Sequence, residues 1–469
     1  MKTIFLRMLK FTLICLILFL HADISAALDI RVKLSDPGKF SISSSANISL
    51  TDTKNKSHSI GKSSTLTVSG GTVTAGKNKF SLPVTLKSGS SISFKGRRYR
   101  GTFRITKSGE LINVLNIEDY LRGVLKAEAN PNWSMEYLKV QAIVSRTFAL
   151  RESQGSRSRG YDVTDTTSSQ VYHGISAETA RTDQAVRDTK DKVLAYGNEL
   201  AFTPFHSDSG GATANNADVW GKDLPYLRSV KEPMAYQSPN SNWETRISSN
   251  ELSTAIRNVA PNVGVVQDIK VLETDQNGRA VNLRIIGSAS SAVIRASAFR
   301  TAVGPNKLKS TFLVLAGTND TKQTPPVTKT TSAQTPKIEI NMKEELTPKE
   351  DALLTQMFTD GVFTNAEMMD ILLKPEKRKE YLYRAIVRGG QPSQEETYSP
   401  SSSRNEPITS GASIPFANGY FIFRGRGWGH GVGMSQYGAM NLANNGWKAD
   451  QILTHYFPGT KIKTATTGK

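Results

Sequence analysis

The spacing of apolar residues changes near position 117. Between residues 28 and 116, short segments alternate apolar with polar positions, as at 65–68, and glycine pairs such as Gly70 and Gly71 separate them. Alternation with a period of two places apolar side chains on one face of a strand, and glycine pairs are typical of turns. We therefore predict antiparallel strands throughout residues 28–116.

Helical spacing begins at Ile117. A first helix is expected from Ile117 to about Glu128, because Pro131 forbids its continuation and forces the residue before it out of helical geometry. A second helix is expected from about Ser134 to Arg151, and its high apolar content predicts that it is buried. Strands mixed with short helices follow, with helices expected near residues 249–259, 296–303, 434–445 and 449–457. The pattern as a whole predicts an α+β fold.

Two stretches of linker composition interrupt this pattern. Residues 318–335 are rich in Thr, Pro and Lys, and residues 391–410 are rich in Ser, Pro and Glu. Between them, residues 347–350 and 364–367 each match a helix N-terminal capping box, and a third helix is expected from Pro375. The predicted domains are a β-rich N-terminal region (28–116), a mixed core (117–317), a helical insertion (318–410) and a C-terminal segment (411–469) that completes the core.

The first 27 residues have the order of a secretory signal peptide. Basic residues come first, a largely apolar run follows at 11–20, and small residues stand at 25–27. The run is too short to span a bilayer, and no later stretch is long and apolar enough. The mature chain is therefore expected to be exported, to a periplasmic or an extracellular, cell-wall-associated location, without a transmembrane segment.

Cysteine content and charge narrow the expected chemistry. The single cysteine, Cys15, lies in the predicted signal peptide, so we expect neither disulfides nor cysteine-ligated metal in the mature chain. The formal net charge is +18, and a basic run such as residues 95–100 would suit nucleic acid or a solvated strand face. Because export argues against nucleic acid as a partner, we favour the anionic polymers of a cell envelope.

Glycine stands at every second position from Gly425 to Gly433. Side chains of an extended chain alternate between two faces, so this glycine array would leave one face of a strand bare. Glycine weakens a strand, and its presence in register predicts that either a ligand or another piece of backbone approaches the bare face closely. The first alternative would make the array one wall of a binding cleft.

Uncommon polar residues lie among apolar neighbours in four segments. These are residues 120–128 with the helix that follows, 162–172, 205–213 and 425–437. Taken in order, they resemble the stage II sporulation protein D (SpoIID) and amidase-enhancer LytB family, over about residues 98–312 and 421–460. The resemblance implies a secreted peptidoglycan-processing protein. The sporulation branch implies a lytic transglycosylase acting on glycan strands without stem peptides, and the enhancer branch implies a non-catalytic activator of an amidase.

Glu128 is the candidate catalytic acid. Breaking a glycosidic bond requires a carboxylic acid that stays protonated near neutral pH. Glu128 ends the first predicted helix, where the negative end of the helix dipole disfavours the ionised carboxylate, and Trp133 would supply an apolar wall. The residues alone also suit a surface glutamate at a fraying helix end. In the resemblance, the family's catalytic acid falls on Glu128.

The remaining candidates are proposed to bind substrate. Arg146 would hold a muramyl carboxylate in a bidentate pair, or would form a structural ion pair instead. The other candidates share polar side chains in the four segments, and each also suits a satisfied core polar group: Gln170, Tyr172, His206, Ser209, His430, Ser435, Gln436 and Tyr437.

No metal or cofactor is expected. The histidines lack a zinc-peptidase spacing, and Thr and Ser stand near residues 165–172 where some sporulation members carry Cys and His zinc ligands. A hydrolase triad of His206, Asp208 and Ser209 is disfavoured, because triad members so close in sequence rarely reach the required geometry.

These observations favour one function over a second. We expect a peptidoglycan lytic transglycosylase that cleaves the bond between N-acetylmuramic acid and N-acetylglucosamine and leaves anhydro-muramic ends. The alternative is a non-catalytic cell-wall binder that activates an N-acetylmuramyl-L-alanine amidase. The expected partners are peptidoglycan glycan strands and, for the alternative, a cell-wall amidase.

Overall fold

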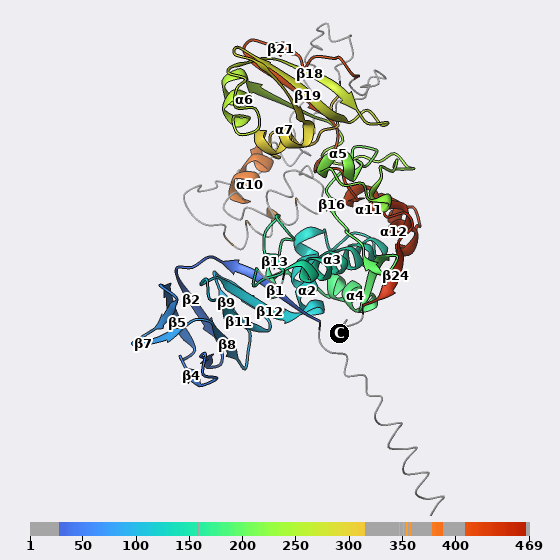
Figure 1. The fold of residues 1–469 in the computed structure, drawn as a ribbon. Helices are drawn as coiled ribbons and strands as arrows, with labels where there is room; N and C mark the ends of the chain where they lie inside the picture. Colours follow the sequence, from blue (N-terminus) through green and yellow to red (C-terminus); the bar gives the residue numbers. More distant parts are fainter. Residues whose placement is uncertain are drawn as a thin grey trace, which may run out of the picture. The chain divides into compact units, whose positions relative to one another are not determined.

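The computed structural model describes residues 28–156, 159–314 and 409–465, with positions 347, 350, 353, 354, 357 and 378–387 (Figure 1). The predicted signal peptide and most of the predicted insertion lie outside the described residues. Helices and several separate sheets occur together, which confirms the predicted α+β class. None of the helices in the described ranges combines the length and the apolar character that a membrane crossing requires.

The chain forms two compact units. The first contains residues 1–206, 223–230 and 432–469, and the second contains residues 207–222 and 231–431. Each unit is therefore assembled from segments that are distant in the sequence. The domain boundaries expected from the sequence, including the insertion at 318–410, remain predictions.

The first unit opens with twelve strands, as the alternating pattern predicts. They are β1 (Asp29–Ser35), β2 (Lys39–Ser44), β3 (Ile48–Thr51), β4 (Ser57–Ser59), β5 (Ser63–Ser69), β6 (Thr72–Ala75), β7 (Asn78–Ser81), β8 (Val84–Ser88), β9 (Ile92–Phe94), β10 (Arg97–Tyr99), β11 (Thr102–Ile105) and β12 (Leu111–Asn116). A seven-stranded sheet has the order β13-β1-β12-β11-β8-β3-β4, in which β13 is Val163–Thr164, and a six-stranded sheet has the order β10-β9-β2-β5-β6-β7. Alternate side chains such as Leu66 and Val68 are buried, which explains the period of two.

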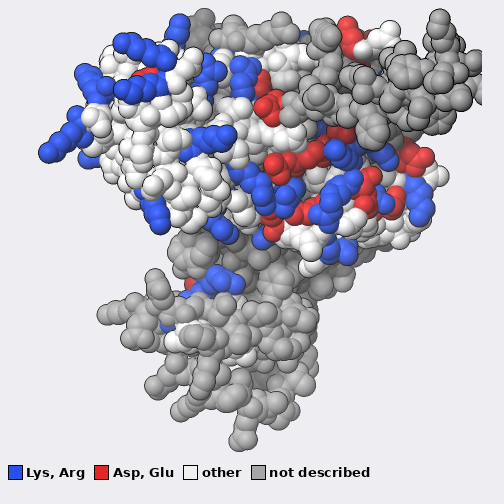
Figure 2. Space-filling model, turned by 90° about the horizontal axis from the view of Figure 1, so that it is seen from below, with Lys and Arg blue, Asp and Glu red and all other residues white. Residues whose placement is uncertain are grey.

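Charge is distributed unevenly over this unit. Between Lys39 and Lys107 the sequence contains 13 Lys and Arg residues but a single acidic residue, Asp52. In Figure 2, Lys and Arg dominate the part of the surface that these strands form. Over the helices, Asp and Glu are mixed with Lys and Arg. The strands therefore present a surface with a positive field, which attracts anionic polymers.

Helices follow the strands. They are α2 (Ile117–Glu128), α3 (Met135–Gly155), the 3-10 helix η1 (Gly174–Ala177) and α4 (Ala180–Asp188), and strands β14 (Lys192–Tyr196), β15 (Glu199–Leu200) and β16 (Phe205–His206) come next. Helix α2 has the predicted bounds, and α3 runs about one turn beyond its predicted end. Buried side chains line α3 from Tyr137 to Leu150, which confirms that it is a core helix.

Residues 432–469 return to the first unit, whereas residues 411–431 belong to the second. The returning residues contain β23 (Met434–Ser435), α11 (Gln436–Asn444), α12 (Ala449–Tyr456) and β24 (Lys461–Thr464). Strand β23 pairs in parallel with β16, and β24 pairs antiparallel with β14. In Figure 1 these red elements lie beside α3 and α4, and α12 and α11 also contact α3.

The second unit is built on two three-stranded sheets. One has the order β17-β22-β21 and the other β18-β19-β20. The elements are α5 (Asn216–Trp220), β17 (Trp243–Ser248), α6 (Ser249–Ala255), β18 (Val266–Thr274), β19 (Ala280–Gly287), β20 (Ser291–Arg295), α7 (Ala296–Val303), β21 (Phe416–Ala417) and β22 (Tyr420–Gly425). Their apolar core includes Ile269, Leu283, Phe299 and Phe423. A short 3-10 helix, η2 (Pro225–Leu227), belongs to the first unit.

One helix of the predicted insertion is described. It is α10 (Arg378–Val387), in which Leu382 and Ala385 pack against Leu354. The first predicted capping box is present, because the Thr347 N–H donates to Glu350 and the Glu350 N–H donates to the Thr347 hydroxyl. The second, at 364–367, lies outside the described residues.

Candidate functional site

Glu128 is the last residue of α2, and a neighbouring loop holds its carboxylate. Oε1 accepts the backbone N–H of Val171 at 2.6 Å. The same loop is fixed to α2 at Gly123, whose carbonyl accepts the N–H of His173 and whose bare Cα lies under the Tyr172 ring. A Cβ on Gly123 would lie 2.4 Å from Tyr172 Cε2, so glycine is needed for the loop to come this close.

Burial controls the protonation of Glu128. Desolvation raises the pKa of Glu128 from 4.5 to about 7, and the hydrogen bond from Val171 opposes this effect only in part. The sequence argument invoked both the helix dipole and an apolar wall, and burial is the main cause in the structure. No ion pair joins Glu128 to a basic side chain in the described part of the chain. The raised pKa therefore favours the protonated form at neutral pH more than in an exposed glutamate.

Polar and aromatic side chains from α3 and α11 surround this position. Gln436 Nε2 donates to the Glu128 carbonyl at 2.9 Å, and Tyr137 donates its hydroxyl to Gln141 Oε1 at 3.0 Å. Trp133 packs edge-on against two tyrosines. Its ring centroid lies 4.8 Å from that of Tyr137 and 5.2 Å from that of Tyr437. The structure thus brings Glu128, Gln436 and Tyr437 together, with Trp133 near them as the sequence suggested.

Gln170 and Tyr172 flank the residue that binds Glu128. Gln170 is buried, and its Oε1 accepts the hydroxyl of Tyr120 at 3.0 Å, whereas its Nε2 has no hydrogen-bond partner among the described residues. Tyr172 is also buried, and its hydroxyl donates to Asn113 at 2.8 Å. The contacts of Tyr172 support the alternative of a satisfied core residue, while Gln170 precedes Val171, whose N–H binds Glu128.

Arg146 lies in the interior. Its Nε and Nη2 donate to the two carboxylate oxygens of Glu118 at 2.8 and 2.6 Å, and Nη1 donates to the Lys192 carbonyl at 3.1 Å. The side chain has no exposed surface. This geometry supports the structural ion pair over the binding of a muramyl carboxylate.

Ser435 and His206 hold the returning C-terminal segment. The hydroxyl of Ser435 accepts the N–H of Gly438 at 3.2 Å and so caps α11. His206 Nδ1 donates to the Val432 carbonyl at 3.2 Å, and both side chains are buried. Each residue thus has a structural role that the sequence left open.

Ser209 and His430 belong to the second unit. The buried Ser209 hydroxyl accepts the N–H of Gly211 at 3.1 Å, and the His430 ring lies 4.9 Å from that of Trp220. Their assignment as sugar-binding residues remains a prediction.

The predicted strand geometry of the glycine array is wrong beyond Gly425. Gly427, Gly429, Gly431 and Gly433 all have positive φ values, of 77°, 132°, 85° and 73°, which a regular strand does not contain. A Cβ on Gly427 would lie 2.6 Å from the Asp208 carbonyl oxygen in the second unit, and one on Gly433 would lie 2.2 Å from that of Pro204 in the first. At these positions the chain's own backbone makes the close approach.

Sequence reasoning missed several neighbours of Glu128. Val171 binds Glu128 through its backbone N–H, so the identity of its side chain gives no signal in the sequence. Tyr120 lies near the site through its hydrogen bond to Gln170, which the sequence does not show. Tyr137 stands one helical turn before Gln141, and this spacing was the available signal. Within the described residues, no group of three His, Cys, Asp or Glu side chains could hold a metal ion.

Comparison with known proteins finds a family match within the first unit. Residues 106–196, which include Glu128, match the family SpoIID, Stage II sporulation protein. An uncharacterized protein of Brachyspira hyodysenteriae is 31% identical over 201 residues, covering 43% of this chain and 53% of that protein. The amidase enhancer of Bacillus subtilis is 26% identical over 385 residues, covering 81% of this chain and 46% of the enhancer. Stage II sporulation protein D of Bacillus subtilis is 33% identical over 147 residues, covering 28% of this chain and 43% of that protein.

The chain spans about half the length of the curated relatives it matches. The predicted resemblance is confirmed: residues 106–196 match the SpoIID family, and the chain is similar to the amidase enhancer and to stage II sporulation protein D.

Proposed function

We propose that this protein is an exported lytic transglycosylase that acts on the glycan strands of peptidoglycan. One observation carries the proposal. Glu128, inside the segment that matches the SpoIID family, has a pKa raised to about 7 by burial. A general acid is most effective when its pKa lies near the working pH, and an exposed glutamate would be almost fully ionised there.

A single carboxyl group can perform both proton transfers. Glu128 donates its proton to the bridging oxygen as the bond from C1 of N-acetylmuramic acid to that oxygen breaks. The carboxylate then takes the proton of the C6 hydroxyl as this oxygen bonds to C1 and closes the anhydro ring. No water is consumed. Glu128 is ionised between the two transfers and protonated again after the second.

The neighbours of Glu128 suit this chemistry. Its carboxylate accepts a hydrogen bond from the neutral Val171 N–H. Trp133 and Tyr437, both partly exposed, offer aromatic surface for a sugar ring. Hydrolytic glycosidases that activate water use a second carboxylate, which the anhydro-forming reaction does not require.

A second function has its own support. The similarity to the amidase enhancer extends over 81% of this chain, far beyond the SpoIID segment. As an enhancer, this protein would bind the cell wall through its basic strands and activate an amidase without cleaving glycan itself.

The Glu128→Gln variant separates the two functions. Purified protein is incubated with glycan, with and without stem peptides, and anhydro-muramic products are measured by mass spectrometry. The variant should lose a factor of about 100 to 10,000 in rate, and wild-type cleavage should fall above about pH 7. Glu152→Gln, which removes an acid from a partly exposed ion pair on α3, is the matched control and should cleave normally.

Two results would redirect the proposal. Cleavage retained by Glu128→Gln would assign the acid to another residue. Wild-type protein that releases no anhydro product but stimulates an amidase would be an enhancer.

A further inference from the structure

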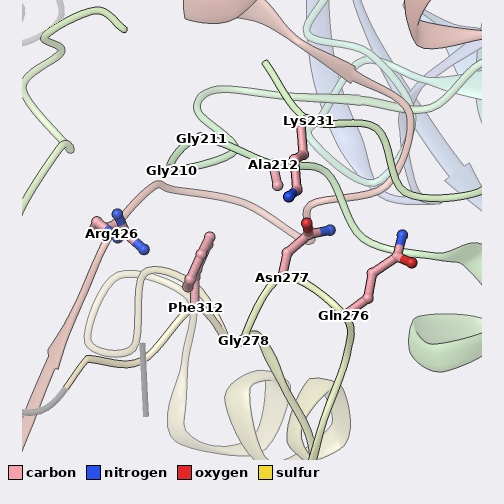
Figure 3. Close-up of a pocket in the computed structure, with 9 residues that line it drawn as sticks. All are labelled: Gly210, Gly211, Ala212, Lys231, Gln276, Asn277, Gly278, Phe312 and Arg426. Carbon is pink, nitrogen blue, oxygen red and sulfur yellow. The ribbon is translucent and has the colours of Figure 1, made fainter. Parts of the chain in front are cut away.

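A pocket of about 370 Å³ lies within the second unit (Figure 3). Its lining includes Gly210, Gly211, Lys231, Asn277, Phe312 and Arg426. In Figure 3 the Arg426, Lys231, Asn277 and Phe312 side chains border the same space. A volume of this size accommodates a sugar-sized ligand. A Cβ on Gly211 would meet no atom within 4 Å, so this wall offers bare backbone to an approaching ligand.

Two guanidinium groups share the ring of Phe312. Cζ of Arg426 lies 4.4 Å from the ring centroid, and Cζ of Arg279 lies 5.0 Å from it. Arg279 is buried, and its Nη2 donates to the carbonyls of Ser209 and Ala212 at 2.6 and 2.9 Å. Its Nε and Nη1, and Nε of Arg426, find no hydrogen-bond partner in the described part of the chain. Neither arginine forms a salt bridge with a described carboxylate.

Two carboxylates near Arg279 accept hydrogen bonds from other groups, and Asp275 Oδ2 has no hydrogen-bond partner among the described residues. Asp208 accepts the Tyr236 hydroxyl and the Gly210 N–H, each at 2.8 Å, and also the Ser238 hydroxyl. Asp275 Oδ1 accepts the N–H groups of Asn277 and Arg279, at 2.8 and 2.9 Å. Their charges attract Arg279, but neither carboxylate pairs with the guanidinium groups directly.

The cations also disfavour one another. Burial lowers the pKa of Arg279 to about 10, and the charges of Arg300 and Arg426 lower it further, while burial also lowers the pKa of Arg426. Both groups remain charged at neutral pH. Asp275 and Asp208 offset this repulsion at Arg279 through their charges, but no described carboxylate forms a salt bridge with either arginine. A ligand with a negative charge would supply that direct partner.

We propose that this pocket binds a carboxylate on a cell-wall fragment, with Arg426 and the exposed Lys231 as its cationic ligands. The planar guanidinium of Arg426 suits two-point binding of a carboxylate. Arg279 acts through Phe312 as a positioning residue, because it supports the ring from within the core. Two parts of the wall carry such a carboxylate, the lactyl group of a muramic acid and the stem peptide. That the ligand comes from the wall rests on the proposed function, whereas the charge of the pocket does not.

Calorimetric titration of the full chain tests this proposal. The ligands are N-acetylmuramic acid, muramyl dipeptide and N-acetylglucosamine, which lacks a carboxylate. We expect at least one of the two acidic ligands to bind more tightly than N-acetylglucosamine, and their relative affinities identify the source of the carboxylate. Arg426→Gln should weaken binding at least about tenfold, because it removes a charge-assisted hydrogen bond.

Two further variants control for folding and for net charge. Lys231→Gln changes an exposed side chain, so it keeps the test valid if Arg426→Gln is unstable. Arg424→Gln removes a charge two residues earlier, where Arg424 pairs with Glu244 at 2.8 Å, and should leave the affinity unchanged. Equal affinity for all three ligands, or unchanged affinity in both Arg426→Gln and Lys231→Gln, would overturn the proposal.

The proposed function fails separately. Performing the titrations on Glu128→Gln as well removes cleavage while leaving the pocket intact. Binding without any glycan cleavage by the wild type would refute the transglycosylase and keep the pocket. Glycan cleavage by the wild type without carboxylate-dependent binding would keep the transglycosylase and refute the pocket.

Discussion

A glutamate lies near each end of α2, and the two side chains have different partners. At the N-terminal end, Glu118 forms a bidentate ion pair with the fully buried Arg146. At the C-terminal end, Glu128 accepts one backbone N–H and has no cationic partner in the described structure. Two copies of the same side chain, three turns apart, thus have opposite environments. The two glutamates therefore differ in their partners, although they lie on the same helix.

Breaking the N-terminal pair should have the largest effect on stability. Arg146→Leu leaves the largely buried Glu118 without its counter-charge, and we expect a loss of about 3–5 kcal/mol in the free energy of unfolding. Chemical denaturation measures this loss. Arg187→Leu, which changes an exposed side chain on α4, should cost less than about 0.5 kcal/mol.

The double variant Glu118→Leu with Arg146→Leu sharpens this test. It should recover much of the stability that Arg146→Leu loses, because no buried charge is left unpaired. A loss below about 1 kcal/mol in the single variant would show that the pair is not structural.

At the other end of α2, Glu128→Gln should gain stability at alkaline pH. The folded protein holds the Glu128 proton more tightly than the unfolded chain, since burial raises the pKa from 4.5 to about 7. The wild type therefore loses stability as the pH rises from about 4.5 to about 7, and the variant does not. The difference should reach at most about 3 kcal/mol at pH 8 and vanish at pH 4, as measured by denaturation at both values. Equal pH dependence of the two proteins would contradict a raised pKa.

Gly123, in the middle of α2, tests the contact that places Val171 at Glu128. Gly123→Ala should destabilise the fold by about 1–3 kcal/mol, although alanine favours helix, because its Cβ would lie 2.4 Å from Tyr172. Gly155→Ala, at the end of α3, meets nothing within 4 Å and should be neutral or slightly stabilising. If both variants behave alike in thermal denaturation, the loop does not depend on Gly123.

Local signals in the sequence predicted the helices well. The acidic first turn and Pro131 bracket α2, and both act within a few residues of the helix ends. The environment of Glu128 depends instead on Val171, which lies 43 positions further along the chain. The partner of Arg146 is 28 residues away, and the spacing left the ion pair and the ligand equally open.

The glycine array illustrates the same limit. Alternation predicted a close approach but also a strand, and the positive φ values follow from backbone that comes from residues 204 and 208. No pattern within residues 425–433 specifies that contact. Sequence reasoning therefore proposed candidate residues, whereas their partners became visible only in the fold.

Direct titration of Glu128 tests the central claim. Protein labelled with ¹³C at the glutamate carboxyl carbon is followed by NMR from pH 3 to pH 9, and the signal that Glu128→Gln removes is assigned to Glu128. We predict that this carboxyl titrates at about pH 7. Titration near 4.5, the ordinary value for glutamate, would show that Glu128 is an ionised carboxylate at neutral pH and would contradict its role as the acid.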